Sequence, residues 1–166
     1  MAAQEHHHRH DRSHLKIGII TLSDSRTADT DESGKLVREL VEGAGHRVVH
    51  YQIAPDTPEL IERAISSQLA DVDALLLNGG TGIAPRDVTI EVVRRMLDKE
   101  LDGFGELFRM LSYNEIGPAA FLSRALAGVI QGKIVVALPG SPAACRLGLE
   151  RLLLPELGHM AHLLGL

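Results

Sequence analysis

The chain has 166 residues, of which 45% are hydrophobic and 23% are charged, and it carries a formal net charge of −5. This composition fits one globular domain and excludes a disordered chain, while no apolar run approaches the roughly 20 residues that a membrane-spanning helix needs. Aromatic residues make up only 3% of the chain and tryptophan is absent, so few side chains can stack on bases. The negative net charge also opposes binding to a nucleic-acid backbone.

The first 14 residues are rich in histidine and are expected to lie outside the fold, which leaves one domain over residues 15–166. They hold five of the nine histidines. A solvated tail is the expected structure, and metal binding is the alternative because imidazole is a good ligand. Cys145 is the single cysteine, which excludes an intrachain disulfide. The lack of an apolar leader and of a disulfide predicts a cytoplasmic location.

The first half of the domain alternates between short apolar runs and amphipathic segments. Residues 16–22 form a continuous apolar run rich in β-branched side chains, which is typical of a strand buried on both faces. The pattern then predicts a helix over 35–45, a strand over 47–53, a helix over 55–69 and a strand over 74–77.

The second half continues the alternation less regularly. A helix is predicted over 88–97, and residues 101–127 are expected to form two helices around a turn at 113–117. A last strand is predicted over 134–138, and a closing helix packs Cys145 into the core. Strand–helix alternation of this kind predicts a three-layer α/β fold with a mostly parallel central sheet and helices on both faces.

Glycine, serine and aspartate concentrate in the loops that follow the predicted strands. All such loops of a parallel sheet emerge at one edge, where ligands of these folds bind. We therefore expect a phosphate-bearing small molecule to bind at this edge. The loops are SDSR (23–26), Pro55-Asp56, GGTG (79–82) and PGSP (139–142).

Two of these loops are candidates for holding an anion. The glycines of residues 79–82 permit positive φ and let backbone amides approach a phosphate, although a plain tight turn is the alternative. In the second loop, Ser141 can cap a helix that has Pro142 at its first position, and this structural role accounts for both residues. The amides of Gly140 and Ser141 could also hold a phosphate.

Two aspartates stand at the same edge. Asp56 and Asp87 each precede a predicted helix and could simply be N-caps. Beside a polyphosphate, however, two carboxylates would repel the ligand unless a cation lies between them, and Mg²⁺ binds one or two carboxylates together with phosphate oxygens. This combination indicates a Mg²⁺–nucleotide site, with Arg86, Arg109 and Arg124 as candidates for neutralising phosphate charge.

Four segments together resemble the molybdopterin-binding MoaB/MogA family, and its MoaB branch in particular. The similarity extends from about Ile17 to the C-terminus, and the glycine-loop motifs carry most of its specificity. The segments are GGTGIAPRDVT (79–89), FGELFRMLSYNEIG (104–117), SRALAG (123–128) and LPGSPAACR (138–146).

The resemblance implies a role in molybdenum cofactor biosynthesis. Active family members adenylylate molybdopterin: its terminal phosphate attacks the α-phosphorus of Mg-ATP, and pyrophosphate leaves. Positioning and charge neutralisation suffice for such a transfer, which agrees with the lack of an evident nucleophile–base pair in the sequence. The resemblance assigns catalysis and Mg²⁺ binding to Asp56 and Asp87, and ligand binding to Gly79, Gly80, Thr81, Gly82, Ser123, Gly140 and Ser141.

The resemblance also implies a homotrimer, which in some members pairs into a hexamer, with other cofactor-assembly proteins as further partners. Two alternatives to an enzyme stay open on the sequence. One is a non-catalytic protein that binds or delivers molybdopterin, and the other is a trimeric scaffold of the same pathway.

Overall fold

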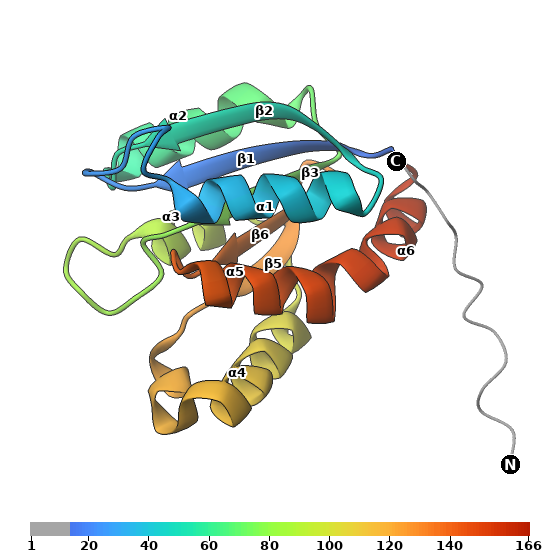
Figure 1. Cartoon of the computed structure of the whole chain (residues 1–166). Coiled ribbons are helices and arrows are strands. Elements are labelled where there is room, and N and C mark those ends of the chain that lie inside the picture. Colours follow the sequence, from blue (N-terminus) through green and yellow to red (C-terminus); the bar gives the residue numbers. More distant parts are fainter. Residues whose placement is uncertain (1–13) are drawn as a thin grey trace, which may run out of the picture.

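The computed structural model describes residues 14–166 as one α/β unit, and residues 1–13, which include most of the histidine-rich segment, lie outside the described residues (Figure 1). The first half of the chain forms three strands and three helices. Their bounds are β1 Lys16–Leu22, α1 Glu32–Gly43, β2 Arg47–Ala54, α2 Pro58–Leu69, β3 Ala74–Asn78 and α3 Thr89–Met96.

The second half adds three strands and a helical C-terminus. The closing helical stretch has one π-helical turn in its middle, η2. The bounds are β4 Lys99–Glu100, α4 Asp102–Ile116, the 3₁₀ helix η1 Gly117–Leu122, β5 Leu126–Ile130, β6 Lys133–Leu138, α5 Pro142–Gly148, η2 Leu149–Leu153 and α6 Leu154–Leu164.

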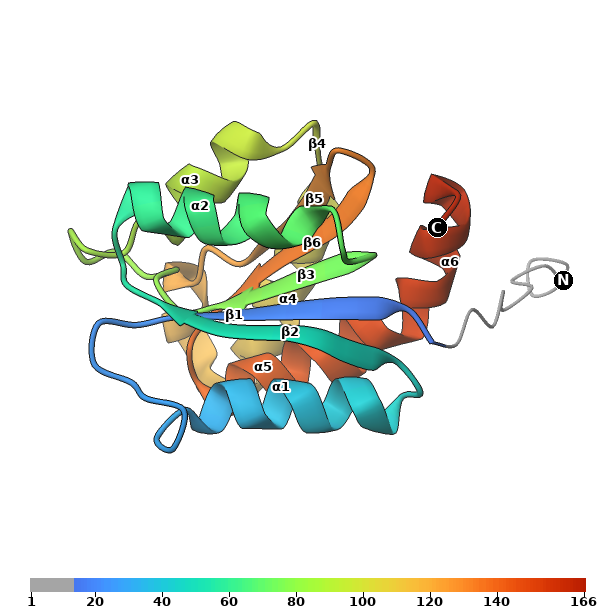
Figure 2. The same ribbon diagram turned by 90° about the horizontal axis from the view of Figure 1, so that it is seen from above.

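The six strands form one mixed sheet in the order β2-β1-β3-β6-β5-β4. The four strands from β2 to β6 are parallel, while β5 and β4 pair antiparallel at one end. Helices α2 and α3 cover one face, and α1 and α5 cover the other (Figure 2). The predicted three-layer fold with a mostly parallel sheet is confirmed.

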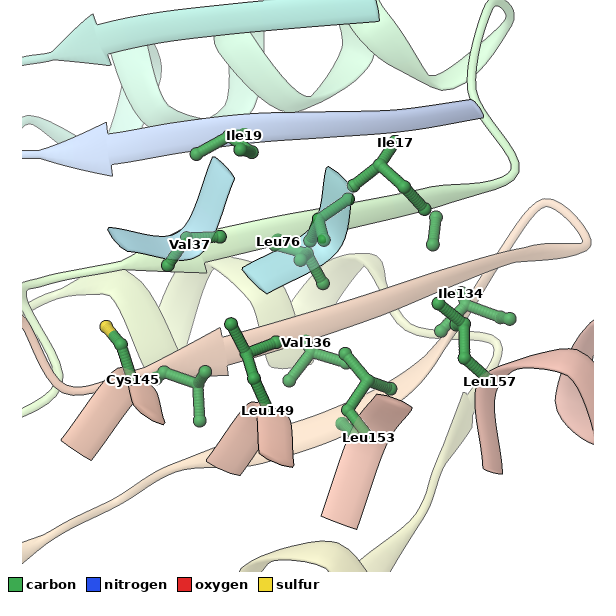
Figure 3. Packing of buried hydrophobic residues seen from close by; sticks show 14 of the residues in the cluster. Ile17, Ile19, Val37, Leu76, Ile134, Val136, Cys145, Leu149, Leu153 and Leu157 are labelled. Atoms are coloured by element: carbon green, nitrogen blue, oxygen red, sulfur yellow. The ribbon is translucent and has the colours of Figure 1, made fainter. Parts of the chain in front are cut away.

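The core consists of two apolar layers, one on each face of the sheet. One layer packs the strands against α1 and the closing helices (Figure 3), and the other packs them against α2 and α3. Cys145 is fully buried in the first layer beside Val37 and Leu149, so its predicted place in the core is confirmed. Ile17, Ile19 and Leu76 face this layer and Ile20 faces the other, as expected for strands covered on both sides.

The predictions for residues 101–127 were partly wrong. One helix, α4, runs through the expected turn to Ile116, and only a 3₁₀ helix follows it. Residues 126–130 then form β5, an antiparallel strand that the apolar pattern did not predict. Strand β5 is short and contains Gly128, so it is specified by pairing with β6 rather than by local propensity.

Helix α1 also starts earlier than predicted, because Asp31 caps it. The Asp31 carboxylate accepts a hydrogen bond from the Gly34 amide at 2.9 Å, so the helix begins at Glu32. Within residues 14–166, no helix is both long enough and apolar enough to cross a membrane.

Candidate functional site

The loops that follow β1, β2, β3 and β6 meet at one edge of the sheet, on the left of Figures 1 and 2. The two glycine loops lie against each other. The Gly79 amide donates to the Leu138 carbonyl oxygen at 3.0 Å, and a Cβ built on Gly140 would lie 3.2 Å from the Gly79 Cα. A Cβ on Gly140 would fit only if the neighbouring backbone moved slightly, and a Cβ on Gly79 would clash with the Leu22 carbonyl oxygen, so glycine is favoured at both positions.

The loop of residues 79–82 has the backbone conformation that its glycines permit. Gly79 and Gly80 have φ values of +103° and +64°, which side chains other than hydrogen rarely allow. Thr89 holds the loop in place: its hydroxyl donates to the Gly79 carbonyl at 2.9 Å, and its amide donates to the Gly80 carbonyl at 3.1 Å. Within the described chain, the amides of Gly80, Thr81 and Gly82 meet no protein acceptor and can donate to a ligand.

Asp56 and Asp87 both border this loop. A Cβ built on Gly80 would lie 3.0 Å from Asp56 Oδ1, and one on Gly82 would lie 2.7 Å from Asp87 Oδ2. Asp56 Oδ1 is buried and has no hydrogen-bond partner among the described residues. The two carboxylates, far apart in the sequence, therefore both lie close to one glycine loop.

A third carboxylate, that of Asp24, belongs to the same cluster. It accepts the Asp56 amide at 3.0 Å. Burial raises the pKa of Asp56, the negative charges of Asp24 and Asp87 raise it further, and Arg86 acts in the opposite direction. A cluster with this electrostatic repulsion and an unpartnered carboxylate oxygen suits a cation.

Neither Asp56 nor Asp87 caps a helix, so that structural alternative was wrong. Helix α2 has Thr57 at its N-cap position and α3 has Val88, and neither makes a side-chain cap. Asp87 instead accepts the Ala84 amide at 2.9 Å and closes a turn within the loop.

The PGSP loop is held from two sides. Ser141 caps α5 by accepting the Ala144 amide at 3.2 Å, which confirms its predicted structural role. The Gly140 carbonyl accepts hydrogen bonds from Arg26 at 3.1 Å and from the Ser33 hydroxyl at 2.6 Å. With this carbonyl fixed, the orientation of the peptide unit that carries the Ser141 amide is fixed as well.

A buried acid anchors Arg26. Asp31 is fully buried, pairs with Arg26 at 3.3 Å and accepts the Tyr51 hydroxyl at 2.5 Å. Burial alone would raise the pKa of Asp31, but hydrogen bonds from Thr21, Tyr51 and Gly34 and the charge of Arg26 outweigh it and lower the pKa. Burial and Asp31 together raise the pKa of Tyr51 to about 12.

Among the described residues, Ser123 makes its hydrogen bonds with Arg109, Ala120 and Ala125, and none with the glycine loops. Ser123 lines a concavity of about 450 Å³ between α4 and β5, together with Arg109, Phe121 and Arg124. The Ser123 carbonyl accepts a hydrogen bond from Arg109 at 3.4 Å. The remaining residues that line the concavity are Arg94, Glu100, Leu101, Asp102, Gly105, Glu106, Ala125 and Leu126.

The three predicted phosphate-binding arginines therefore differ in their surroundings. Arg86 is exposed near Asp56, whereas Arg109 faces the concavity. Arg124 donates to the carbonyls of Thr81 and Asp87, so it holds the glycine loop rather than facing open solvent.

Four residues that position the site were not among the predicted site residues: Asp24, Arg26, Asp31 and Thr89. Asp24 and Arg26 belong to the SDSR loop, and their place directly after a strand is a signal that could have found them. The roles of Asp31 and Thr89 depend on contacts with other loops, which spacing does not reveal.

Among the residues that the structure describes, no three histidine, cysteine or acidic side chains form a group that could hold a metal by themselves. The donor set nevertheless fits Mg²⁺ bound with a nucleotide, because phosphate oxygens complete the coordination that two carboxylates begin. The unpartnered Asp56 oxygen is the observation that favours this fit.

Comparison with known proteins identifies relatives over nearly the whole domain. Residues 18–159 match the family described as "Probable molybdopterin binding domain". The chain is 52% identical over 159 residues, 94% of either chain, to "Molybdenum cofactor biosynthesis protein B" of Halalkalibacterium halodurans. A crystal structure of a molybdenum cofactor biosynthesis protein B matches with a TM-score of 0.89 and 51% identity, covering 92% of this chain and 97% of that one.

The molybdopterin biosynthesis enzyme MoaB from Thermus thermophilus matches with a TM-score of 0.79 and 37% identity. The match covers 90% of this chain and 96% of that one.

Proposed function

Because this chain belongs to the molybdopterin-binding family and is similar to molybdenum cofactor biosynthesis protein B throughout its domain, we propose that it is a molybdopterin adenylyltransferase. The reaction transfers AMP from ATP to the terminal phosphate of molybdopterin and releases pyrophosphate. The observation that carries the proposal is the pairing of unpartnered amides at Gly80 and Thr81 with an unpartnered carboxylate oxygen at Asp56, all within the described residues.

The glycine loops would hold the phosphates. Backbone amides of Gly80, Thr81 and Gly82 offer donors from one loop, and Gly140 and Ser141 offer donors from the other. Because Arg26 and Ser33 donate hydrogen bonds to the Gly140 carbonyl, the second loop keeps its shape without a ligand. A preformed set of donors costs little reorganisation when charge develops on the phosphates.

Asp56 and Asp87 would hold Mg²⁺. Bound with ATP, the ion would neutralise phosphate charge and favour departure of pyrophosphate. The protein's own contribution is to fix both carboxylates beside the glycine loop, Asp56 by the hydrogen bond from its amide to Asp24 and Asp87 by accepting the Ala84 amide. Thr89 holds the loop through its hydrogen bonds to the Gly79 and Gly80 carbonyls.

The attacking phosphate of molybdopterin needs no general base, because it is already an anion. The chain therefore needs only to place its oxygen in line with the bond to the departing pyrophosphate. The concavity beside Ser123 and Arg109 offers room for the pterin end of the substrate. Its mixture of charged and polar groups suits the polar edges of a pterin ring.

We also propose self-association into a homotrimer, or a hexamer of two trimers. Helix α4 and the 3₁₀ helix after it project from the body of the domain (Figure 1) and carry large apolar side chains that are exposed. Exposed apolar patches of this kind favour protein contacts. The free, buried Cys145 suits a reducing, cytoplasmic compartment. Light scattering during size-exclusion chromatography measures the assembly, and a monomer at micromolar concentration contradicts it.

The deciding experiment incubates the purified protein with molybdopterin, ATP and Mg²⁺. Chromatography then follows adenylylated pterin and pyrophosphate over time. We expect both products in equal amounts, and neither when Mg²⁺ is chelated. Tight pterin binding without either product would contradict the enzyme and support a binding or delivery protein. Absence of both binding and product would support a scaffold.

A further inference from the structure

The side chain of Arg124 joins the two ends of the segment that carries Asp87. Its Nε donates to the Thr81 carbonyl at 3.3 Å, and its Nη2 donates to the Asp87 carbonyl at 2.9 Å. These two carbonyls lie at the start and the end of the exposed turn over residues 81–87. Arg124 comes from the segment between η1 and β5, so this link crosses from the concavity to the glycine loop.

Glu91, in the first turn of α3, orients the guanidinium. Both its carboxylate oxygens accept from Arg124, Oε1 from Nη1 and Oε2 from Nη2. A planar guanidinium can serve two carbonyls and a carboxylate at once, because its five donors point in fixed directions. The hydrogen bond from Arg124 is the main cause that lowers the pKa of Glu91, so this partner is charged near neutral pH.

The rest of the turn has few other attachments. Within it, Asp87 donates its amide to the Ala84 carbonyl at 2.8 Å and accepts the Ala84 amide at 2.9 Å. Those bonds close the turn on itself but do not join it to the body of the domain. Ile83 at its tip is 72% exposed. Thr89, two residues after Asp87, joins the base of the turn to Gly79 and Gly80, and the Arg124–Glu91 pair adds the hydrogen bond to the carbonyl of Asp87 itself.

We propose that Arg124 is a positioning residue that holds Asp87 at the metal site, and that Glu91 acts by orienting Arg124. This inference rests on the proposed adenylyltransferase function, and it assigns to Arg124 a role other than direct contact with phosphate. It also links the two parts of the site, because the same side chain that lines the concavity supports the carboxylate beside the glycine loop.

The Glu91→Gln variant separates the two roles of Arg124. If Glu91 orients a positioning arginine, the neutral amide weakens the pair and turnover falls about fivefold, with a higher Mg²⁺ concentration at half-maximal rate. If Arg124 binds phosphate directly, the same variant releases the guanidinium and turnover stays equal or rises. Unchanged or increased turnover in Glu91→Gln overturns the proposal.

The Arg124→Lys variant keeps the charge but removes the forked geometry. Turnover is expected to fall about 10- to 100-fold, because a misplaced catalytic group costs that much. The Michaelis constant for molybdopterin should change little. The matched control is the ion pair Arg146–Glu150, an arginine–glutamate pair on the closing helices, and Arg146→Lys and Glu150→Gln should leave turnover unchanged.

Hydrogen–deuterium exchange gives a readout that does not depend on catalysis. In the substrate-free protein, the amides of Ala84 and Asp87, which are hydrogen-bonded within the turn, should exchange several-fold faster in Glu91→Gln and in Arg124→Lys than in the wild type, while the β3 amides stay protected. Unchanged exchange in both variants overturns the inference. If the wild-type protein forms no adenylylated product, the proposed function fails, and the exchange result alone then supports or overturns the role of the pair.

Discussion

Replacing Asp56 with asparagine should stabilise the substrate-free protein while it abolishes activity. Asp56 carries a buried oxygen without a partner among the described residues and faces the carboxylates of Asp24 and Asp87. An asparagine keeps the shape, removes one negative charge and presents an amide that can donate to a neighbouring carboxylate. Functional sites commonly hold such unfavourable groups, because the ligand needs them.

The expected size follows from the environment of the side chain. A buried polar atom without a partner costs about 1–3 kcal/mol, and Asp56 is only half-buried, so about 1 kcal/mol applies here. For a domain of this length, that free energy raises the midpoint of thermal unfolding by about 2–4 °C. Circular dichroism at pH 7 in a chelating buffer measures it, with the exposed Glu39→Gln as a control that also removes one negative charge.

The stabilisation should depend on pH with a defined sign. The pKa of Asp56 is raised in the folded protein, so the wild type is destabilised by its ionisation as the pH rises through that value. The difference between the variant and the wild type should therefore be small near the ordinary carboxyl pKa of 3.8 and reach its full size at neutral pH.

Magnesium should make the wild type more stable than the Asp56→Asn variant. In the presence of ATP, Mg²⁺ at ten times its Kd stabilises the wild type by about 1.4 kcal/mol, and the asparagine variant should gain much less. An Asp56→Asn variant that melts at or below the wild-type temperature in chelating buffer would refute the reasoning. A variant that Mg²⁺ with ATP stabilises as much as the wild type would refute it as well.

Three other substitutions test separate parts of the site. Asp87→Asn should keep its melting temperature, because asparagine can still accept the Ala84 amide, but lose about 100-fold or more in product formation; a fully active folded variant would remove Asp87 from the reaction. Gly80→Ala should cost about 1–3 kcal/mol of unfolding free energy through its positive φ, and more through the clash of its Cβ with the Thr89 hydroxyl. Gly132→Ala, at a similar φ of +75° but in open space, is the matched control, and equal losses would argue against the clash. Ser141→Ala should lower unfolding free energy by about 1 kcal/mol through loss of the cap, and an unchanged denaturation midpoint would show that the cap contributes nothing.

Much of the fold follows from local patterns in the sequence. The predicted strands match β1, β2, β3 and β6 to within about one residue. Continuous apolar runs mark β1, β3 and β6, since strands covered on both faces need apolar side chains at nearly every position, whereas β2 lies at the sheet edge and is only partly buried. The edge where Asp56, Gly80 and Gly140 meet follows from the same pattern, because parallel strands send all their following loops to one side. The helix starts were less accurate, because Asp31 rather than another polar residue nearby caps α1, and α2 begins after Thr57 without a side-chain cap.

The amino-acid sequence by itself thus determined the layers, the family and which loops gather at the site. Only the tertiary structure decided what each polar side chain does there. From the sequence alone, Asp56 and Asp87 could be helix caps or metal ligands, and Arg124 could bind phosphate. The atoms that these side chains contact in the structure distinguish the roles. The physical reason is that apolar burial and backbone pairing repeat at short periods along the chain, whereas a hydrogen bond such as that from Arg124 to Asp87 joins residues 37 positions apart.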